Sequence, residues 1–99
     1  MYVSFIGNLV RDAEEKTWVN SAGEKKVLLQ FTVAESTFFR GEKGTEFIVC
    51  TSSQLSVSKF LTKGKRVAVC GNASIERWEG KDGKPSSRVA VMVYDVKLL

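Results

Sequence analysis

The chain has 99 residues, with 15 lysines and arginines against 11 aspartates and glutamates, so its formal net charge is +4. A length near 100 residues allows one domain with one modest hydrophobic core. The sequence contains no histidine, which removes the commonest general base and metal ligand and argues against catalysis. The positive excess favours an anionic partner, and its placement along the chain matters more than its total.

The cysteines and the apolar runs further restrict the class of protein. Two cysteines, Cys50 and Cys70, are too few for a disulfide framework, so we expect a reduced, cytoplasmic protein. No apolar run approaches the ~20 residues of a membrane span, and we expect neither a signal peptide nor membrane association. The cysteine spacing fits no zinc module, and no Gly-Lys-Ser or Gly-Lys-Thr is present. We therefore predict a protein without metal or cofactor that is not an enzyme.

The first half of the chain reads as three strands. The first predicted strand covers Tyr2–Val10, and Arg11–Lys16 reads as a polar stretch after it. Apolar residues then alternate through Lys26–Val33, which predicts a strand with one buried face. A turn at Gly41–Gly44 leads into the third predicted strand, Thr45–Thr51.

A short helix is predicted next, at Leu55–Leu61. Within it Val57, Phe60 and Leu61 have the i, i+3, i+4 spacing of one apolar stripe. Ser52-Ser53 can supply the N-cap, and Lys63-Gly64 can close the helix. So short a helix is unstable alone, and we expect it to pack against the sheet.

Two longer strand patterns complete the chain. They cover Arg66–Trp78 and Ser87–Leu98. The tip between them, Glu79–Pro85, contains Asp82-Gly83, a pair that favours a hairpin turn. The second of these patterns is led by alternating valines, which predicts one buried face.

The predicted order is therefore β-β-β-α-β-β, with the helix between the third and the fourth strand. This order is typical of the OB-fold, a small five-stranded Greek-key barrel. We predict one all-β OB-fold domain over residues 1–99. Gly7 and Gly71 lie inside strand patterns, where glycine often marks a bulge or the sharp bend of a closing barrel.

Trp78 is the first candidate binding residue. It shares the polar alternation of its strand with Glu76, which places the indole on an outer face if no bulge intervenes. The alternative is a half-buried tryptophan that packs under the following loop. Bases of a single strand stack on aromatic rings while lysine and arginine pair with phosphates, so nearby cations favour a binding platform. Four cations lie near Trp78 in sequence: Arg77, Lys81, Lys84 and Arg88.

Four further aromatic residues are candidates for binding. Trp18, Phe38 and Phe39 precede the Gly41–Gly44 turn, and Phe47 follows it. Phe38 and Phe39 are adjacent on an extended chain and must point to opposite sides. If the alternation of residues 27–33 continues along the strand, Phe38 points outward and Phe39 points inward. Phe47 fits a platform or a core position equally well, and Trp18 is either a platform or a lid on the core. The cations beside the turn, candidates for phosphate contacts, are Arg40 and Lys43.

Several segments, in order and at matching spacing, resemble the bacterial single-stranded DNA-binding proteins, the SSB family. They are Ile6–Glu14, Phe31–Ala34, Thr45-Glu46-Phe47, Phe60–Gly71, and Arg77-Trp78 followed by Lys81-Asp82-Gly83. The resemblance implies sequence-tolerant binding of single-stranded DNA by a homo-oligomer, a tetramer or a dimer. It also implies a role in protecting that DNA during replication, recombination or repair.

The resemblance assigns base stacking to Phe39, Phe47 and Trp78. It prefers Phe39 where simple alternation prefers Phe38, so Phe39 is the prediction and Phe38 the alternative. Two of the three positions hold Phe where the family usually has Trp, and Ser53 stands at a further aromatic position of the family. Trp18 lies within a residue of another such position. The resemblance therefore implies less stacking surface here than in the family at large.

Family members carry a flexible Gly/Pro/Gln-rich tail with an acidic tip that recruits partner proteins. This sequence stops at Leu99, where the barrel is expected to end. Either the tail has been removed, or this is a naturally short paralogue; for the chain as given we expect no partners recruited by a tail. A different class, an OB interaction module like primosomal protein B that binds single-stranded DNA weakly, fits the length. This alternative agrees less well with the presence of all three stacking aromatics, Phe39, Phe47 and Trp78. An enzyme on an OB-like barrel ranks last, because no carboxylate cluster stands out.

Overall fold

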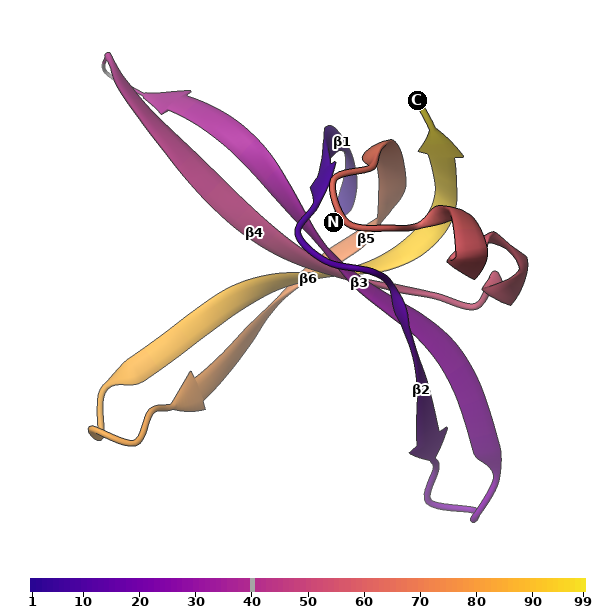
Figure 1. The fold of residues 1–99 in the computed structure, drawn as a ribbon. Helices are drawn as coiled ribbons and strands as arrows, with labels where there is room; N and C mark the ends of the chain where they lie inside the picture. Colours follow the sequence, from indigo (N-terminus) through magenta and orange to yellow (C-terminus); the bar gives the residue numbers. More distant parts are fainter. Residues whose placement is uncertain (40) are drawn as a thin grey trace.

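The computed structural model describes residues 1–39 and 41–99, and it describes the side chains of all of these except 36–39, 42 and 43. Strands make up most of the described chain, and one short 3₁₀ helix, η1, interrupts them (Figure 1). The elements are β1 (Tyr2–Leu9), β2 (Glu14–Val19), β3 (Lys25–Phe39), β4 (Glu42–Ser52), η1 (Leu55–Phe60), β5 (Arg66–Glu79) and β6 (Pro85–Leu98).

Five of the strands close into a ring. The neighbour order is β1-β5-β6-β4-β3, and β1 returns to β3 through the pairs Asn8↔Ala34 and Leu9↔Val33. The β4–β6 pair is parallel, whereas β1–β5, β3–β4 and β5–β6 are antiparallel. This closed all-β arrangement, with the helix between β4 and β5, confirms the predicted OB-fold order.

The sixth strand, β2, differs from the prediction. Residues 14–19 pair with 25–30 of β3 along their whole length, yet all six residues of β2 are exposed. A strand with no buried face has no apolar alternation, and this is why the sequence reads there as a polar connection. β2 lies along the edge of β3 that faces away from β4, next to the short β1–β3 pairing.

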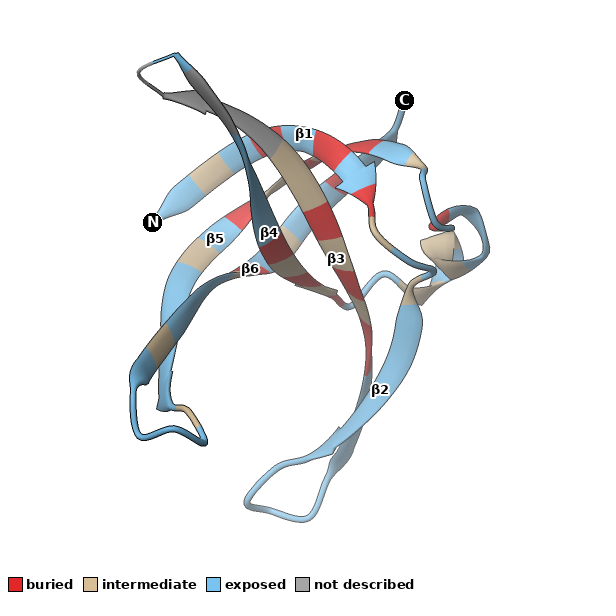
Figure 2. Cartoon of the chain, turned by 60° about the vertical axis from the view of Figure 1, so that its left-hand side comes forward, coloured by how far each residue is buried: buried red, intermediate tan, exposed pale blue. Residues whose placement is uncertain are grey.

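Three hairpins extend from the ring as arms. They are the β2–β3, β3–β4 and β5–β6 hairpins, and Figure 1 shows them projecting in different directions. β3 serves two of them, because its first half pairs with β2 and its second half pairs with β4. In Figure 2 the buried residues gather where the strands pass one another, while the β5–β6 arm is exposed almost throughout.

The core lies inside the ring and is built from alternate strand positions. The predicted alternation is confirmed in β3, where Leu29, Phe31 and Val33 are buried, although Val27 is 41% exposed because it lies on an arm. The buried apolar residues that form one cluster are Phe5, Leu9, Leu29, Phe31, Val33, Ile48, Cys50, Leu61, Val67, Val69, Val91 and Val96.

Both strand glycines allow a close backbone approach, as a bend in the barrel requires. A β-carbon at Gly7 would lie 2.5 Å from the carbonyl oxygen of Ala34, and one at Gly71 would overlap the carbonyl oxygen of Met92. The β5–β6 register shifts between Cys70 and Gly71, so the predicted irregularity is confirmed there. The pairs on either side leave Tyr94 as the extra residue. The bulge therefore belongs to β6, and the alternation of β5 continues unbroken.

The helix is shorter and tighter than predicted. It is a 3₁₀ helix without a buried residue, and its Phe60 is 49% exposed. Leu61, just after it, is fully buried in the core. The Ser52 hydroxyl accepts a hydrogen bond from the Gln54 N–H at 3.1 Å, but no side chain caps the helix itself. The segment has six residues, and 3₁₀ helix typically occurs in such short pieces. No helix among the described residues is long and apolar enough to cross a membrane.

Candidate nucleic-acid interface

The sheet has one face turned away from the core, which we call the outer face. Directly opposed residues of neighbouring strands share a face, and so do residues two apart on one strand. Ile48 and Cys50 of β4 are buried, so Phe47 and Val49 point outward. The strand registers extend this assignment from β4 to β3 and β2 on one side and to β6 and β5 on the other.

Trp78 lies on the outer face of the β5–β6 arm. It opposes Ser86, and two further steps of two along β6 reach Ala90, which pairs with the outward Val49. Because the bulge lies on β6 at Tyr94, beyond these pairs, it does not reverse the assignment. The indole is 47% exposed. The ring is therefore displayed on this face, and it also lines a hollow with Gly83 and Pro85 of the tip.

Phe47 and Trp18 occupy the same face on the other two arms. Phe47 opposes Ala34 on the β3–β4 arm and is 58% exposed, so the core alternative does not apply to it. Trp18 opposes Lys26 on the β2–β3 arm and is 41% exposed. Each of the three arms thus displays one described aromatic side chain on the outer face.

A shallow hollow of about 410 Å³ lies on the outer face between the β2–β3 arm and the β5–β6 arm. Its floor is apolar and includes Leu28, which is 8% exposed, while Met92 at its side is 51% exposed. The lining residues are Trp18, Leu28, Gln30, Val49, Thr51, Glu76, Arg88, Ala90 and Met92. An apolar floor with a polar rim suits a flat ring that carries hydrogen-bonding edges.

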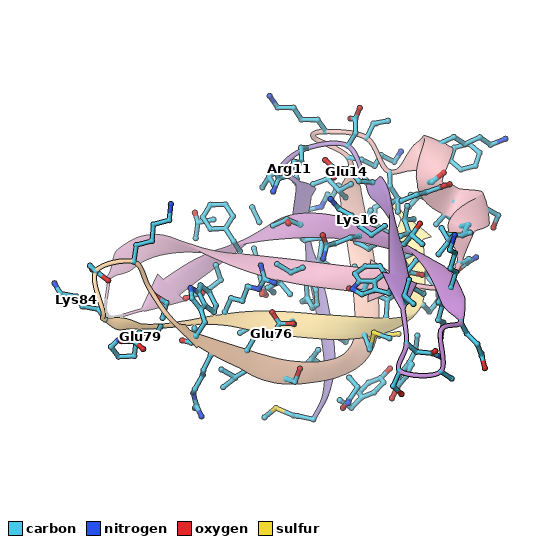
Figure 3. The ribbon with its side chains drawn as sticks, turned by 90° about the horizontal axis from the view of Figure 1, so that it is seen from below. Arg11, Glu14, Lys16, Glu76, Glu79 and Lys84 are labelled. Carbon is cyan, nitrogen blue, oxygen red and sulfur yellow. The ribbon has the colours of Figure 1, made fainter. Side chains whose placement is uncertain are left out.

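Among the described side chains, two ion pairs lie on this face, one on each side of the hollow. The Arg88 Nε donates to a Glu76 carboxylate oxygen at 2.7 Å, and the guanidinium carbon lies 5.7 Å from the centroid of the Trp78 ring. On β2 the Lys16 Nζ lies 2.9 Å from a Glu14 carboxylate oxygen. The hydrogen bond from Lys16 and its charge lower the pKa of Glu14. Figure 3 labels Glu76 on one arm and Glu14 and Lys16 on the other side.

The other predicted cations of the β5–β6 arm are distributed differently. Arg77 opposes Ser87, so it lies on the face opposite to Trp78, and Lys81 and Lys84 are exposed in the turn at the tip. Asp82 builds this turn, because its carboxylate accepts the Lys84 N–H at 3.0 Å. Figure 3 shows Lys84 at the end of the arm. Arg88 is thus the predicted cation that the structure brings against Trp78.

The predictions around the β3–β4 turn lie outside the described residues. The side chains of Phe38, Phe39 and Lys43 are not described, although their backbones pair across β3 and β4, and Arg40 is not described at all. Their proposed contacts stay predictions.

Part of this face is not predicted from the sequence. Gln30, Thr51 and Met92 line the hollow, and each directly follows or precedes a buried strand residue. That alternation was a usable signal for outward position. Alternation alone does not show which outward residues of different strands lie side by side, because that depends on the strand registers. Among the described residues, no group of three or more His, Cys, Asp or Glu side chains could hold a metal ion.

Comparison with known proteins identifies the family. A model of the single-strand binding protein family matches residues 2–99, so the chain belongs to this family. The single-stranded DNA-binding protein of Chlamydia caviae is 31% identical over 100 residues, covering 98% of this chain and 60% of that protein. That of Treponema pallidum is 36% identical over 107 residues, covering 99% and 57%. The chain therefore spans about three fifths of the length of these relatives.

Solved structures show the same fold. The chain matches the Plasmodium falciparum SSB complex with ssDNA at a TM-score of 0.71 and 21% identity, covering 99% of this chain and 93% of that one. It matches the small single-stranded DNA-binding protein from Streptomyces coelicolor at a TM-score of 0.70 and 14% identity, covering 100% and 94%. The family and fold implied by the sequence resemblance are confirmed.

Proposed function

We propose that this chain binds single-stranded DNA with little regard to sequence and without catalysing a reaction on it. One observation carries the proposal: Trp18, Phe47 and Trp78 are exposed on one face of the sheet, one on each arm. Every base has a flat face that can stack on an aromatic ring, so such platforms tolerate any sequence. In a duplex those faces are already stacked on one another, so the same surface favours a single strand.

The cations supply the other half of the proposed contact. We assign phosphate contacts to Arg88 and to the tip residues Lys81 and Lys84, with Arg77 contacting a strand that passes round the arm. Arg40 and Lys43 are proposed for the β3–β4 arm on the sequence alone. The proposed role is protection of single-stranded DNA in the cytoplasm, during replication, recombination or repair.

The proposal is tested with a fluorescently labelled oligo(dT), followed by anisotropy, with duplex DNA of equal length as competitor. We expect the labelled strand to bind and the duplex to compete poorly. The affinity should fall steeply with added salt, because each phosphate contact on a single strand contributes a slope of about −0.7 to log K against log salt. Equal competition by the duplex, or an affinity that salt leaves unchanged, would overturn the proposal.

We further propose that the chain assembles into a homo-oligomer, a dimer or a tetramer, through β1. The β1 strand pairs with β5 along residues 2–8, whereas its pairs with β3 are limited to Asn8 and Leu9. The other edge of β1 is therefore unpaired over residues 2–7 in the described chain. Tyr2 on this strand stacks on Tyr94 at 6.1 Å between ring centroids, and the two side chains are 65% and 66% exposed. Ile6, on the same face of β1 as Tyr2, is 47% exposed. Strand edges next to exposed apolar side chains are common association sites.

Light scattering coupled to size exclusion tests the assembly. The unaltered chain should elute with the mass of two or four copies, and Ile6→Lys should shift it toward one copy. A monomer at all concentrations would contradict the assembly and leave the DNA proposal standing.

A further inference from the structure

Arg88 is engaged twice on the outer face of the β5–β6 arm. Glu76 and Arg88 are directly opposed in the register, and their side chains form the 2.7 Å ion pair. Trp78 lies two positions along from Glu76, and the Arg88 guanidinium carbon is 5.7 Å from its ring centroid. A guanidinium within ~6 Å of an aromatic centroid is attracted to the ring.

These two contacts resemble the contacts that single-stranded DNA would make with Arg88 and Trp78. The Glu76 carboxylate presents an anionic oxygen to Arg88, as a phosphate would. The planar guanidinium lies near the Trp78 ring, 5.7 Å from its centroid, in part of the space that a stacked base would need. A strand that pairs a phosphate with Arg88 and stacks a base on Trp78 must therefore replace contacts that the free protein already makes.

We propose that Glu76 is a positioning residue that restrains single-strand binding by holding Arg88 on the ring of Trp78. This inference rests on the proposed DNA-binding function of the outer face. Glu76 makes no contact with DNA in this scheme and acts through Arg88. The two side chains are each about half exposed, and exposed ion pairs are weak. The restraint is accordingly a modest reduction of affinity, not a block.

The chain offers a matched control for charge alone. Glu79 is exposed on the same arm but lies on the opposite face, since it pairs with Pro85 one position beyond Trp78. Glu79→Gln therefore removes the same negative charge as Glu76→Gln without releasing Arg88. Both positions are exposed, so neither substitution threatens the core.

The first test measures oligo(dT) affinity against salt for Glu76→Gln, Arg88→Gln, the double variant and Glu79→Gln. Glu76→Gln should bind about 2- to 5-fold more tightly, as release of an exposed ion pair allows. Its log K against log salt should steepen by about 0.7, because Arg88 becomes free to neutralise one phosphate. In the Arg88→Gln background, the same substitution should leave the salt slope unchanged.

Three results would overturn the proposal. One is weaker binding by Glu76→Gln, which would make the ion pair an aid to binding. Another is an equal gain in affinity from Glu76→Gln with and without Arg88, which would mean that Glu76 only repels the phosphates. The third is an equal gain from Glu79→Gln.

The second test needs no DNA, and so it separates this inference from the proposed function. The sequence has two tryptophans, so Trp18→Phe leaves Trp78 as the sole indole emitter. In that background Glu76→Gln should raise the acrylamide quenching constant of Trp78, because the guanidinium no longer shields the ring. Glu79→Gln should leave it unchanged. Unaltered quenching with Glu76→Gln would show that Glu76 does not hold Arg88 in place, whether or not the chain binds DNA.

Discussion

Trp78 combines exposure, a cation partner and a place beside the hollow of the outer face. Loss of one stacked base costs about 1–3 kcal/mol, so Trp78→Ala should weaken oligo(dT) binding about 5- to 100-fold. Trp78→Phe keeps an aromatic face and should lose much less. Fluorescence anisotropy with labelled oligo(dT) gives both values. Undiminished affinity in a folded Trp78→Ala variant would remove Trp78 from the interface.

Cys50 makes a separate prediction about pH. It is fully buried, and burial raises the pKa of its thiol to about 12 from a usual value near 9. Well below pH 9 the thiol is neutral in both the folded and the unfolded chain. Between about pH 9 and pH 12 only the unfolded chain gives up this proton, so stability should fall as the pH rises through that range.

Urea unfolding at several pH values checks this, with Cys50→Ala as the comparison. Other groups titrate in both proteins, so the difference between the two unfolding free energies isolates Cys50. The stability of the unaltered chain should drop more steeply above pH 9. Parallel curves for the two proteins would contradict the assignment.

Alternation accounts for what could be predicted at single residues. The outward position of Trp78 follows from the polar residues that share its alternation in β5, and the structure places it there. Phe47 could not be decided from sequence, because it precedes an apolar run in which either alternation looks plausible. The burial of Ile48 and Cys50 decides it. Phe38 and Phe39 stay predictions.

Among the elements, β5 depends on the absence of a side chain at Gly71. Any β-carbon there would overlap the backbone of Met92 in the neighbouring strand. Gly71→Ala should therefore destabilise the fold by about 1–3 kcal/mol, as overpacking of a filled site usually does. Ser74→Ala, an exposed position on the same strand, should change the unfolding free energy by less than about 0.5 kcal/mol. Urea midpoints compare the two, and equal stability would show that the strands separate easily at Gly71.

Strands with a buried face could be predicted from sequence, and the strand without one could not. β3 is recognisable by its buried alternation, whereas β2 has six exposed residues and is defined by its pairing with β3. The parallel β4–β6 pair joins segments about 40 residues apart, and no local pattern records it. The position of the helix follows from the apolar spacing of residues 57–61, whereas that spacing does not distinguish its 3₁₀ form from an α-helix.

At the scale of the whole molecule, ring closure turns three separate hairpins into one candidate interface. Trp18, Phe47 and Trp78 come from different parts of the sequence, and the strand registers place them on one face. The sequence supplied the family resemblance and the identity of these aromatics. The ion pair between Glu76 and Arg88 over Trp78 could not be foreseen, because it depends on the register of the β5–β6 arm.

The proposed path of the DNA crosses the outer face between the β2–β3 arm and the β5–β6 arm. Trp18 stands on the first and Trp78 on the second. The most direct measurement is ¹⁹F NMR of the chain labelled with 5-fluorotryptophan, titrated with oligo(dT), with Trp18→Phe used to assign the two resonances. We predict that both resonances shift and saturate together. Saturated binding in which neither resonance moves would contradict the outer face as the site of single-strand binding.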